Sequence, residues 1–95
     1  MRDYEVVLVI SPQAGEDGMS NTVGRVNQFI SDHGGEVTEE AQWGTRRLAY
    51  RIRNFNEGTY LLTKFKLDPS HTTGLESTIK LSEHVLRHLL IKLDD

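Results

Sequence analysis

The side chains that could do acid–base or metal chemistry are few, and their spacing does not group them. His84 and His88 are four residues apart, a spacing that aligns two imidazoles only on a helix. The surrounding sequence predicts a strand, where residues four apart share a face but lie roughly 13 Å from each other. Glu39 and Glu40 are adjacent, so they point to opposite faces of a strand. We expect no catalytic site, no metal site and no cofactor.

Arginine is the residue type whose clustering does suggest a chemical role. Four of the seven arginines lie within eight residues, at Arg46, Arg47, Arg51 and Arg53. The planar guanidinium group is suited to bidentate binding of phosphate, so the cluster favours phosphate contact. The alternative is a solvated edge strand, because charged edges prevent aggregation. The neighbouring Trp43 is interpreted either as a residue that stacks on a base or ribose or as a partly buried anchor under a loop.

The charge balance limits how strongly the chain alone can bind a polyanion. Eleven Lys and Arg face fourteen Asp and Glu, which gives a formal net charge of −3. Phosphate neutralisation usually dominates nucleic-acid affinity, so this balance argues against tight binding of naked nucleic acid. Many of the acids lie away from the arginine cluster, among them Glu16, Asp17, Glu76 and Asp94. A local basic stripe can therefore contact phosphate on an otherwise acidic body.

Length and composition indicate one soluble globular domain that spans residues 1–95. The chain is 37% hydrophobic and 26% charged and has no cysteine, which excludes disulfides and thiolate metal sites. No apolar run approaches the roughly 18 residues needed to cross a bilayer. The first residues turn directly into a strand pattern and do not resemble a signal peptide. We expect a cytoplasmic protein with no membrane partner.

Two hydrophobic periodicities along the chain predict its helices and strands. The predicted elements are a strand at 3–10, a helix that ends before 34–35, an irregular strand at 36–53 with a bulge at Gly44, a hairpin loop at 54–58, a strand at 59–67, a helix that starts at 68–70 and a strand at 85–92. This β-α-β-β-α-β order is the ferredoxin-like split pattern, an α+β fold with a four-stranded antiparallel sheet and two helices on one face. The first and third strands are then central, and the second and fourth form the edges.

This topology leaves one face of the sheet uncovered, and the residues predicted there suggest an interface. Val7, Val9, Tyr60 and Leu62 are expected to point outward from the central strands as a contiguous apolar patch. The expected margin of the patch is basic, and its members are Arg47, Arg51, Arg53, Lys64 and Lys66. An apolar centre with a basic margin indicates a protein partner, an RNA partner or both. The alternative is an ordinary sheet that carries a few surface hydrophobes.

Three segments of the chain resemble the bacterial small-subunit ribosomal protein six family. They are residues 1–5, 43–52 and 85–88, and the most specific part of them is formed by Gly44, Arg46, Arg47, Leu48, Ala49 and Tyr50. The resemblance covers essentially the whole chain, with the segments in the right order. There are two departures. The family commonly has proline where Arg51 stands, and many members carry a carboxy-terminal tail beyond the position of Asp95.

The resemblance implies a structural role without catalysis and without a small-molecule substrate. Members of the family bind the central domain of the small-subunit ribosomal RNA together with ribosomal protein eighteen, as a heterodimer, in assembly. The apolar sheet face is then the expected seat of that partner. By resemblance, Arg2, Arg46, Arg47, Arg87 and Lys92 fall in segments near RNA, and local charge adds Arg51 and Arg53. The ribosome would be a cytoplasmic one or an organellar one.

Two other functions use the same predicted fold. A ligand-binding regulatory module would bind amino acids at a dimer interface on the apolar face, but this role leaves the arginine cluster unexplained. An enzyme of the acylphosphatase kind would need an arginine in a phosphate-binding loop after the first strand, and residues 11–15 contain none. Binding of a free amino acid would favour the first function, and hydrolysis of an acyl phosphate would favour the second.

Overall fold

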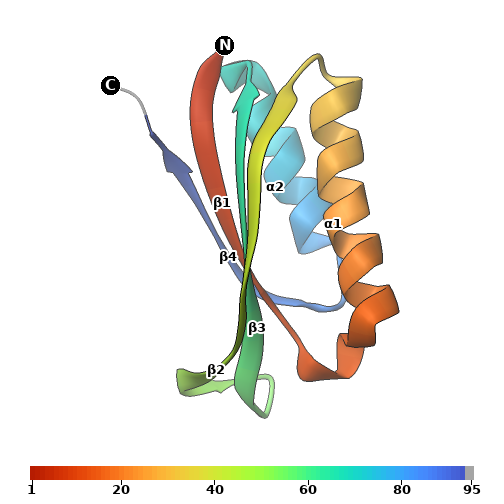
Figure 1. Cartoon of the computed structure of the whole chain (residues 1–95), viewed down its shortest axis with the longest axis vertical. Helices are drawn as coiled ribbons and strands as arrows, with labels where there is room; N and C mark the ends of the chain where they lie inside the picture. The colour runs from red at the N-terminus through yellow and green to blue at the C-terminus, as the bar shows by residue number, and fades with distance from the viewer. Residues whose placement is uncertain (94–95) are drawn as a thin grey trace.

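The computed structural model describes residues 1–93 of the chain (Figure 1). Its helices and strands, in chain order, are β1 (Arg2–Ile10), α1 (Gly15–Asp32), β2 (Glu36–Ile52), β3 (Phe55–Leu67), α2 (Thr72–Lys80) and β4 (Val85–Lys92). A short 3₁₀ turn precedes each helix, at Pro12–Ala14 and Pro69–His71. The predicted β-α-β-β-α-β order is confirmed.

The four strands form one antiparallel sheet in the order β2-β3-β1-β4. As predicted, β1 and β3 are central and β2 and β4 are the edges. Both helices lie on the same side of the sheet (Figure 1), so the α+β, ferredoxin-like architecture is confirmed. Within residues 1–93, no helix combines the length and the apolar character needed to span a membrane.

The core lies between the sheet and the two helices, and the strand alternation selects the residues that enter it. Its central members are Tyr4, Val6, Leu8 and Ile10 of β1, Val26 and Ile30 of α1, Phe65 and Leu67 of β3, and Leu75 and Ile79 of α2. Burial of each large apolar side chain stabilises the fold by about 1.5–3 kcal/mol. A shift of one residue in the β1 register would move its apolar set to solvent, so this pattern fixes which sheet face stays open.

Asp68 fixes the start of the second helical segment, as the sequence predicts. Its Oδ1 accepts a 2.9 Å hydrogen bond from the backbone N–H of Ser70 and a 2.7 Å bond from the Ser70 hydroxyl. These two bonds stabilise the carboxylate, the backbone bond most strongly, and hold the pKa of Asp68 below its ordinary value. The cap starts the 3₁₀ turn that leads into α2, and α2 buries Leu75 and Ile79.

The predicted hairpin loop at 54–58 is wrong. The chain instead turns within two residues, because Arg53 and Asn54 have φ angles of 51° and 69° and β3 begins at Phe55. Two consecutive positive φ values are typical of the type I′ turn, whose twist matches that of the flanking strands. Arg53 therefore lies in the turn and not on the strand that the sequence predicts for it. Gly58 lies within β3, where it is buried.

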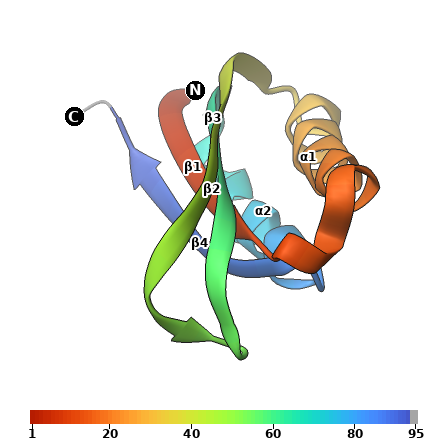
Figure 2. The same ribbon diagram turned by 60° about the horizontal axis from the view of Figure 1, so that its bottom comes forward.

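The long second strand is irregular, as predicted, and its residues 48–51, which we call the bowed segment, are not paired with β3. The register with β3 shifts between Gln42 and Gly44, and Gly44 has a φ of 83°, so the bulge predicted there is confirmed. The register shifts again between Arg47 and Ile52, where β2 has more residues than the facing part of β3. Figure 2 shows the consequence, because β2 bows away from β3 before the two strands meet at the turn.

Candidate nucleic-acid and partner interface

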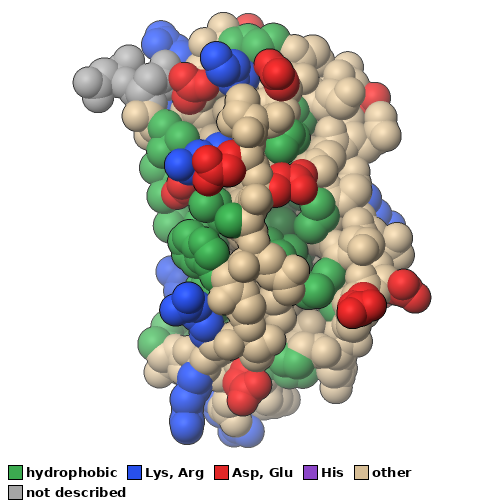
Figure 3. All heavy atoms as spheres, viewed as in Figure 1, with side chains coloured by type: hydrophobic (Ala, Val, Ile, Leu, Met, Phe, Trp, Pro, Cys, Tyr) green, Lys and Arg blue, Asp and Glu red, His purple; other side chains and the backbone are tan. Residues whose placement is uncertain are grey.

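The four clustered arginines lie where β2 and β3 approach their common turn. Arg46 and Arg47 precede the bowed segment of β2, Arg51 lies within it, and Arg53 is in the turn. All four residues are exposed. We call them the hairpin arginines. In Figure 3, Lys and Arg side chains gather at this lower end of the molecule.

Ion pairing distinguishes the hairpin arginines from the lysines of the same sheet. Lys64 Nζ lies 3.9 Å from Glu39 Oε2, and Lys66 Nζ lies 3.9 Å from Asp3 Oδ1. In the part of the chain that the structure describes, no carboxylate oxygen lies within 4.0 Å of a guanidinium nitrogen of the hairpin arginines. Glu57 faces Arg47 across the two strands and Glu83 lies beside Arg53, but neither carboxylate is in a salt bridge with them, so the guanidinium groups remain able to attract an anion.

Arg87 approaches the hairpin arginines from the opposite edge of the sheet. One row of paired residues crosses all four strands, from Gly44 through Tyr60 and Val9 to Arg87. Three strand spacings put Arg87 about 14 Å from Gly44 along this row. The two edge strands are nevertheless in direct contact. Arg87 Nη1 of β4 donates a 2.9 Å hydrogen bond to the phenolic oxygen of Tyr50 in the bowed segment of β2.

Arg2 and Lys92 lie at the other end of the sheet. Lys92 pairs with Tyr4 of β1, and Arg2 pairs with Leu67 of β3. Arg2 and Val9 are separated along β1 by about 23 Å, at roughly 3.3 Å per residue. The residues predicted to contact RNA therefore form two separate groups, with Arg2 and Lys92 at one end of the sheet and the others at the hairpin end.

Trp43 and Tyr60 add an aromatic element to the hairpin end. Together with Arg46 and Arg47 they line an open hollow of about 400 Å³. Trp43 is 46% exposed, a value that fits both the stacking residue and the partly buried anchor that the sequence suggests. The sequence predicts Tyr60 at a protein interface and leaves two interpretations open for Trp43. Trp43 and Tyr60 come together because of the bulge at Gly44. The sequence predicts the bulge but not the strand register that sets which side chains meet there.

The predicted apolar patch is only partly exposed. Val7, Val9, Tyr60 and Leu62 lie on the sheet face opposite the helix-side core, as predicted, but the expected exposure is wrong for two of them. Val7 and Tyr60 are half-buried, and Val9 and Leu62 are only 5% and 6% exposed. Val9 lies between the side chains of Tyr60 and Arg87, and it occupies the space that a side chain at Gly58 would fill. Leu62 is flanked on both sides, by Val7 and by Ala41.

The exposed apolar surface instead extends onto the edge strand β4. Leu89 and Ile91 are 53% and 37% exposed, and they pair with Val7 and Glu5 on the open face. Figure 3 shows apolar side chains in a band along this edge. Sequence reasoning predicted the strand but did not assign its faces. The signal in the sequence is alternation along the strand. Leu90 packs against the core, so its neighbours Leu89 and Ile91 must point to the opposite, open face.

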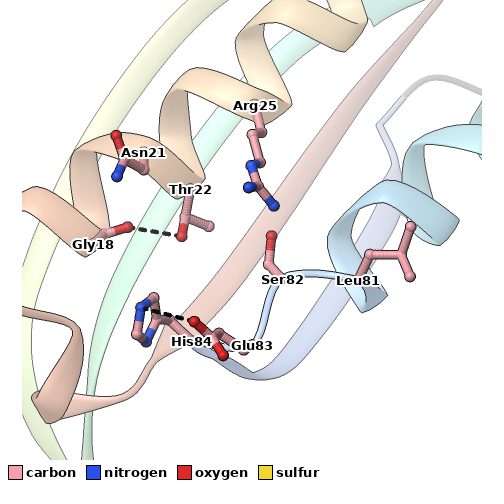
Figure 4. Close-up of a pocket in the computed structure, with 8 residues that line it drawn as sticks. All are labelled: Gly18, Asn21, Thr22, Arg25, Leu81, Ser82, Glu83 and His84. Atoms are coloured by element: carbon pink, nitrogen blue, oxygen red, sulfur yellow. Dashed lines mark hydrogen bonds and ion pairs between the residues drawn. The ribbon is translucent and has the colours of Figure 1, made fainter.

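A second hollow, of about 290 Å³, lies on the helix side between α1 and the segment that joins α2 to β4 (Figure 4). Arg25 and Ser82 point toward each other across it, while His84 Nε2 lies 3.9 Å from Glu83 Oε1. Its lining carries both charge signs. Within the described chain no serine or threonine hydroxyl is hydrogen-bonded to His84. The hollow therefore does not show the nucleophilic hydroxyl bonded to a general base that many hydrolases use.

Two histidines, His84 and His88, share a spacing of four, and the structure places them in different surroundings. His84 lies just before β4, and His88 on β4 lies 3.8 Å from Glu76 of α2. Among residues 1–93 there is no group of three or more His, Cys, Asp or Glu side chains that could hold a metal ion.

Comparison with known proteins identifies similar sequences over nearly the whole chain. The family model described as "Ribosomal protein S6" matches residues 3–92. A "Small ribosomal subunit protein bS6" of Moorella thermoacetica is 41% identical over 95 residues, which cover 100% of this chain and 97% of that protein. The protein of the same name from Syntrophomonas wolfei is 41% identical over 96 residues, covering 100% and 99%.

Solved structures agree with the fold. The 30S ribosomal protein S6 of Thermotoga maritima superposes with a TM-score of 0.89 at 29% sequence identity, over 97% of this chain and 87% of that one. The C-terminal domain of the MgtC protein from Mycobacterium tuberculosis superposes with a TM-score of 0.67 at 13% identity, over 98% and 88%. The second likeness shows a shared fold alone.

Proposed function

The chain belongs to the ribosomal protein S6 family, and we propose that it binds small-subunit ribosomal RNA as one half of a heterodimer with ribosomal protein eighteen. Family membership makes the chain a structural component of the small ribosomal subunit and not an enzyme. The proposal comprises the RNA contact, the heterodimer, the residues that make these contacts and a location in the cytoplasmic ribosome. It also treats residues 1–95 as a single domain.

The observation that carries the RNA contact is that, within residues 1–93, no carboxylate oxygen lies within 4.0 Å of the hairpin arginines, although acids outnumber bases in the chain. Arginines that served only to balance neighbouring acids would be held in ion pairs, as Lys64 and Lys66 are. Guanidinium groups left open at one end of the sheet are suited to phosphate oxygens, which they bind through two parallel hydrogen bonds. Arg87 extends this surface toward β4. Arg2 and Lys92 then provide a second, separate RNA contact.

The heterodimer is supported by the apolar surface beside the arginines. Its accessible part is formed by the exposed Leu89 and Ile91 and the half-buried Val7 and Tyr60, with the buried Val9 and Leu62 between them in the sheet. A protein partner would remove these side chains from water. A basic partner would also complement the net charge of −3 and supply phosphate contacts that this chain lacks. Tyr60 lies where the apolar surface and the arginine surface meet.

The test is RNA binding by the chain, by ribosomal protein eighteen and by the mixture of the two. A central-domain fragment of small-subunit ribosomal RNA is titrated with each sample at fixed salt. We expect weak binding by this chain alone and tight binding by the mixture. Equal RNA affinity for ribosomal protein eighteen with and without this chain would contradict the proposal. Size-exclusion chromatography without RNA separately tests whether the heterodimer forms.

A further inference from the structure

We propose that the hollow formed by Trp43, Arg46, Arg47 and Tyr60 binds one unpaired nucleotide of the RNA. The base would stack on the Trp43 ring and the flanking phosphate would be held by the two arginines. This inference rests on the proposed function and specifies the kind of nucleotide that the site takes. We call these four residues the aromatic–arginine hollow.

The first argument is the placement of Trp43. Gln42 pairs with Leu61 and Gly44 pairs with Tyr60, so Trp43 is the extra residue of the bulge. The positive φ of Gly44, 83°, turns the chain at this point. The bulge brings the indole to the hollow and leaves about half of its surface exposed, whereas a tryptophan in the core would be covered. Bulges commonly redirect a side chain at a functional site.

The second argument is that the indole has no aromatic partner. Tyr4 stacks on Phe65, and Phe29 stacks on His33, but no aromatic ring in residues 1–93 stacks on Trp43. No ring in the described chain therefore competes with a planar ligand for the indole, which is 46% exposed. Stacking of a nucleobase on an aromatic side chain is tolerant of sequence and contributes substantially to single-strand binding.

The third argument is the charge at the wall of the hollow. Arg46 and Arg47 line it, and no carboxylate in the described chain lies within 4.0 Å of either guanidinium. The volume of about 400 Å³ falls within the range of roughly 300–1,000 Å³ typical of small-ligand sites. An aromatic surface next to two open arginines matches the two parts of a nucleotide, a flat base and an anionic phosphate.

The geometry of RNA selects an unpaired nucleotide. In an A-form duplex the bases are stacked on one another and the deep groove is closed to side chains. Only a base that is splayed out in a loop, bulge or junction exposes its face to an indole. A paired RNA segment could still contact the hairpin arginines through phosphate, but it would leave the Trp43 ring in water.

Trp43 is the only tryptophan of the chain, so its fluorescence reports on this hollow alone. The heterodimer is titrated with the central-domain RNA fragment and, separately, with a fully paired duplex of the same length. The emission of a Trp43→Phe sample is subtracted to remove any signal from the partner. We expect the central-domain fragment to quench Trp43 emission and the duplex to leave it unchanged.

Variants supply an independent measurement. Trp43→Ala should weaken RNA binding at least about fivefold, while Trp43→Phe, which keeps a stacking ring, should bind within about twofold of wild type. Wild-type affinity in Trp43→Ala, without quenching in the native protein, would overturn this inference and leave the proposed RNA-binding role intact. Quenching by the partner protein alone, with no further change on adding RNA, would assign the hollow to the partner and also overturn it. Absence of RNA binding by the native heterodimer would instead overturn the proposed function itself.

Discussion

Arg87 on β4 donates a 2.9 Å hydrogen bond to the hydroxyl oxygen of Tyr50 on β2, and this bond joins the two edge strands of the sheet. A second contact supports the same closure, because Arg53 Nη1 donates to the backbone oxygen of Glu83 at 3.3 Å. Together they hold the bowed segment of β2 toward the start of β4. The hairpin arginines and Arg87 are thereby kept at one end of the molecule.

Tyr50→Phe should loosen the bowed segment without unfolding the protein. The bond is exposed, so we expect a loss of no more than about 1 kcal/mol in the free energy of unfolding. Amide hydrogen exchange should accelerate in the bowed segment and stay unchanged in β1. A double-mutant cycle with Arg87→Gln isolates the coupling between the two side chains. Additive effects of the two substitutions would show that the bond does not stabilise the segment in solution.

Gly58 and Gly24 should respond in opposite ways to alanine. A Cβ atom at Gly58 would collide with Cγ1 of Val9, a stiff and buried side chain, so Gly58→Ala should destabilise by about 1–3 kcal/mol. A Cβ at Gly24 meets nothing within 4 Å, and alanine favours the helix by about 1 kcal/mol. Urea unfolding of both variants measures the two changes. A stabilised Gly58→Ala protein would mean that Val9 does not fill this space.

The apolar surface can be tested without damaging the core. Leu89→Asp changes an exposed residue, so we expect a folded protein whose affinity for ribosomal protein eighteen falls roughly tenfold or more. Leu81→Asp is the matched control, because Leu81 is exposed on the helix side. Val9→Asp should instead destabilise the fold itself, because it places a carboxylate at a position that is only 5% exposed. Isothermal titration with the partner measures affinity, and an unchanged value for Leu89→Asp would contradict the proposed interface.

Asp68 gives the protein a defined sensitivity to acid. Because hydrogen bonds from Ser70 hold its pKa in the folded state below the ordinary value, the charged cap contributes stability above the ordinary pKa. That contribution is lost as the pH falls through the lower, folded-state pKa. Asp68→Asn keeps an acceptor at the cap but removes the charge. We expect the wild type to melt at a higher temperature at neutral pH and the difference to close in acid. A difference that stays constant with pH would contradict this origin.

The parts of the fold that follow from local patterns could be predicted, and those that depend on packing between strands could not. The alternation of Tyr4, Val6 and Leu8 specifies a strand and its buried face because a single strand already carries the whole pattern. Gly58 was predicted in the hairpin loop since glycine is common in loops. Its actual role is a close approach to Val9, and that contact exists only once β1 and β3 are paired.

The candidate site shows the same division. The hairpin arginines are close in sequence, so their clustering could be predicted. Tyr50 and Arg87 are 37 residues apart, and their contact depends on the bowed segment of β2. The exposure of Val9 and Leu62 was overestimated. Strand alternation predicts the face to which a side chain points, but how far neighbouring side chains cover it depends on how the strands pair.

The most direct test of the proposed RNA-binding surface compares two variants that lose the same charge. Arg46→Gln with Arg47→Gln removes two charges at the hairpin end, and Arg25→Gln with Lys80→Gln removes two from the helices. Each is measured in the heterodimer with the central-domain RNA fragment over a range of salt concentrations. We expect the first variant alone to bind weakly, with the slope of log affinity against log salt concentration reduced by roughly 0.7–1 for each phosphate that it no longer neutralises. Equal RNA affinity for the two variants would contradict the assignment of RNA binding to the hairpin arginines.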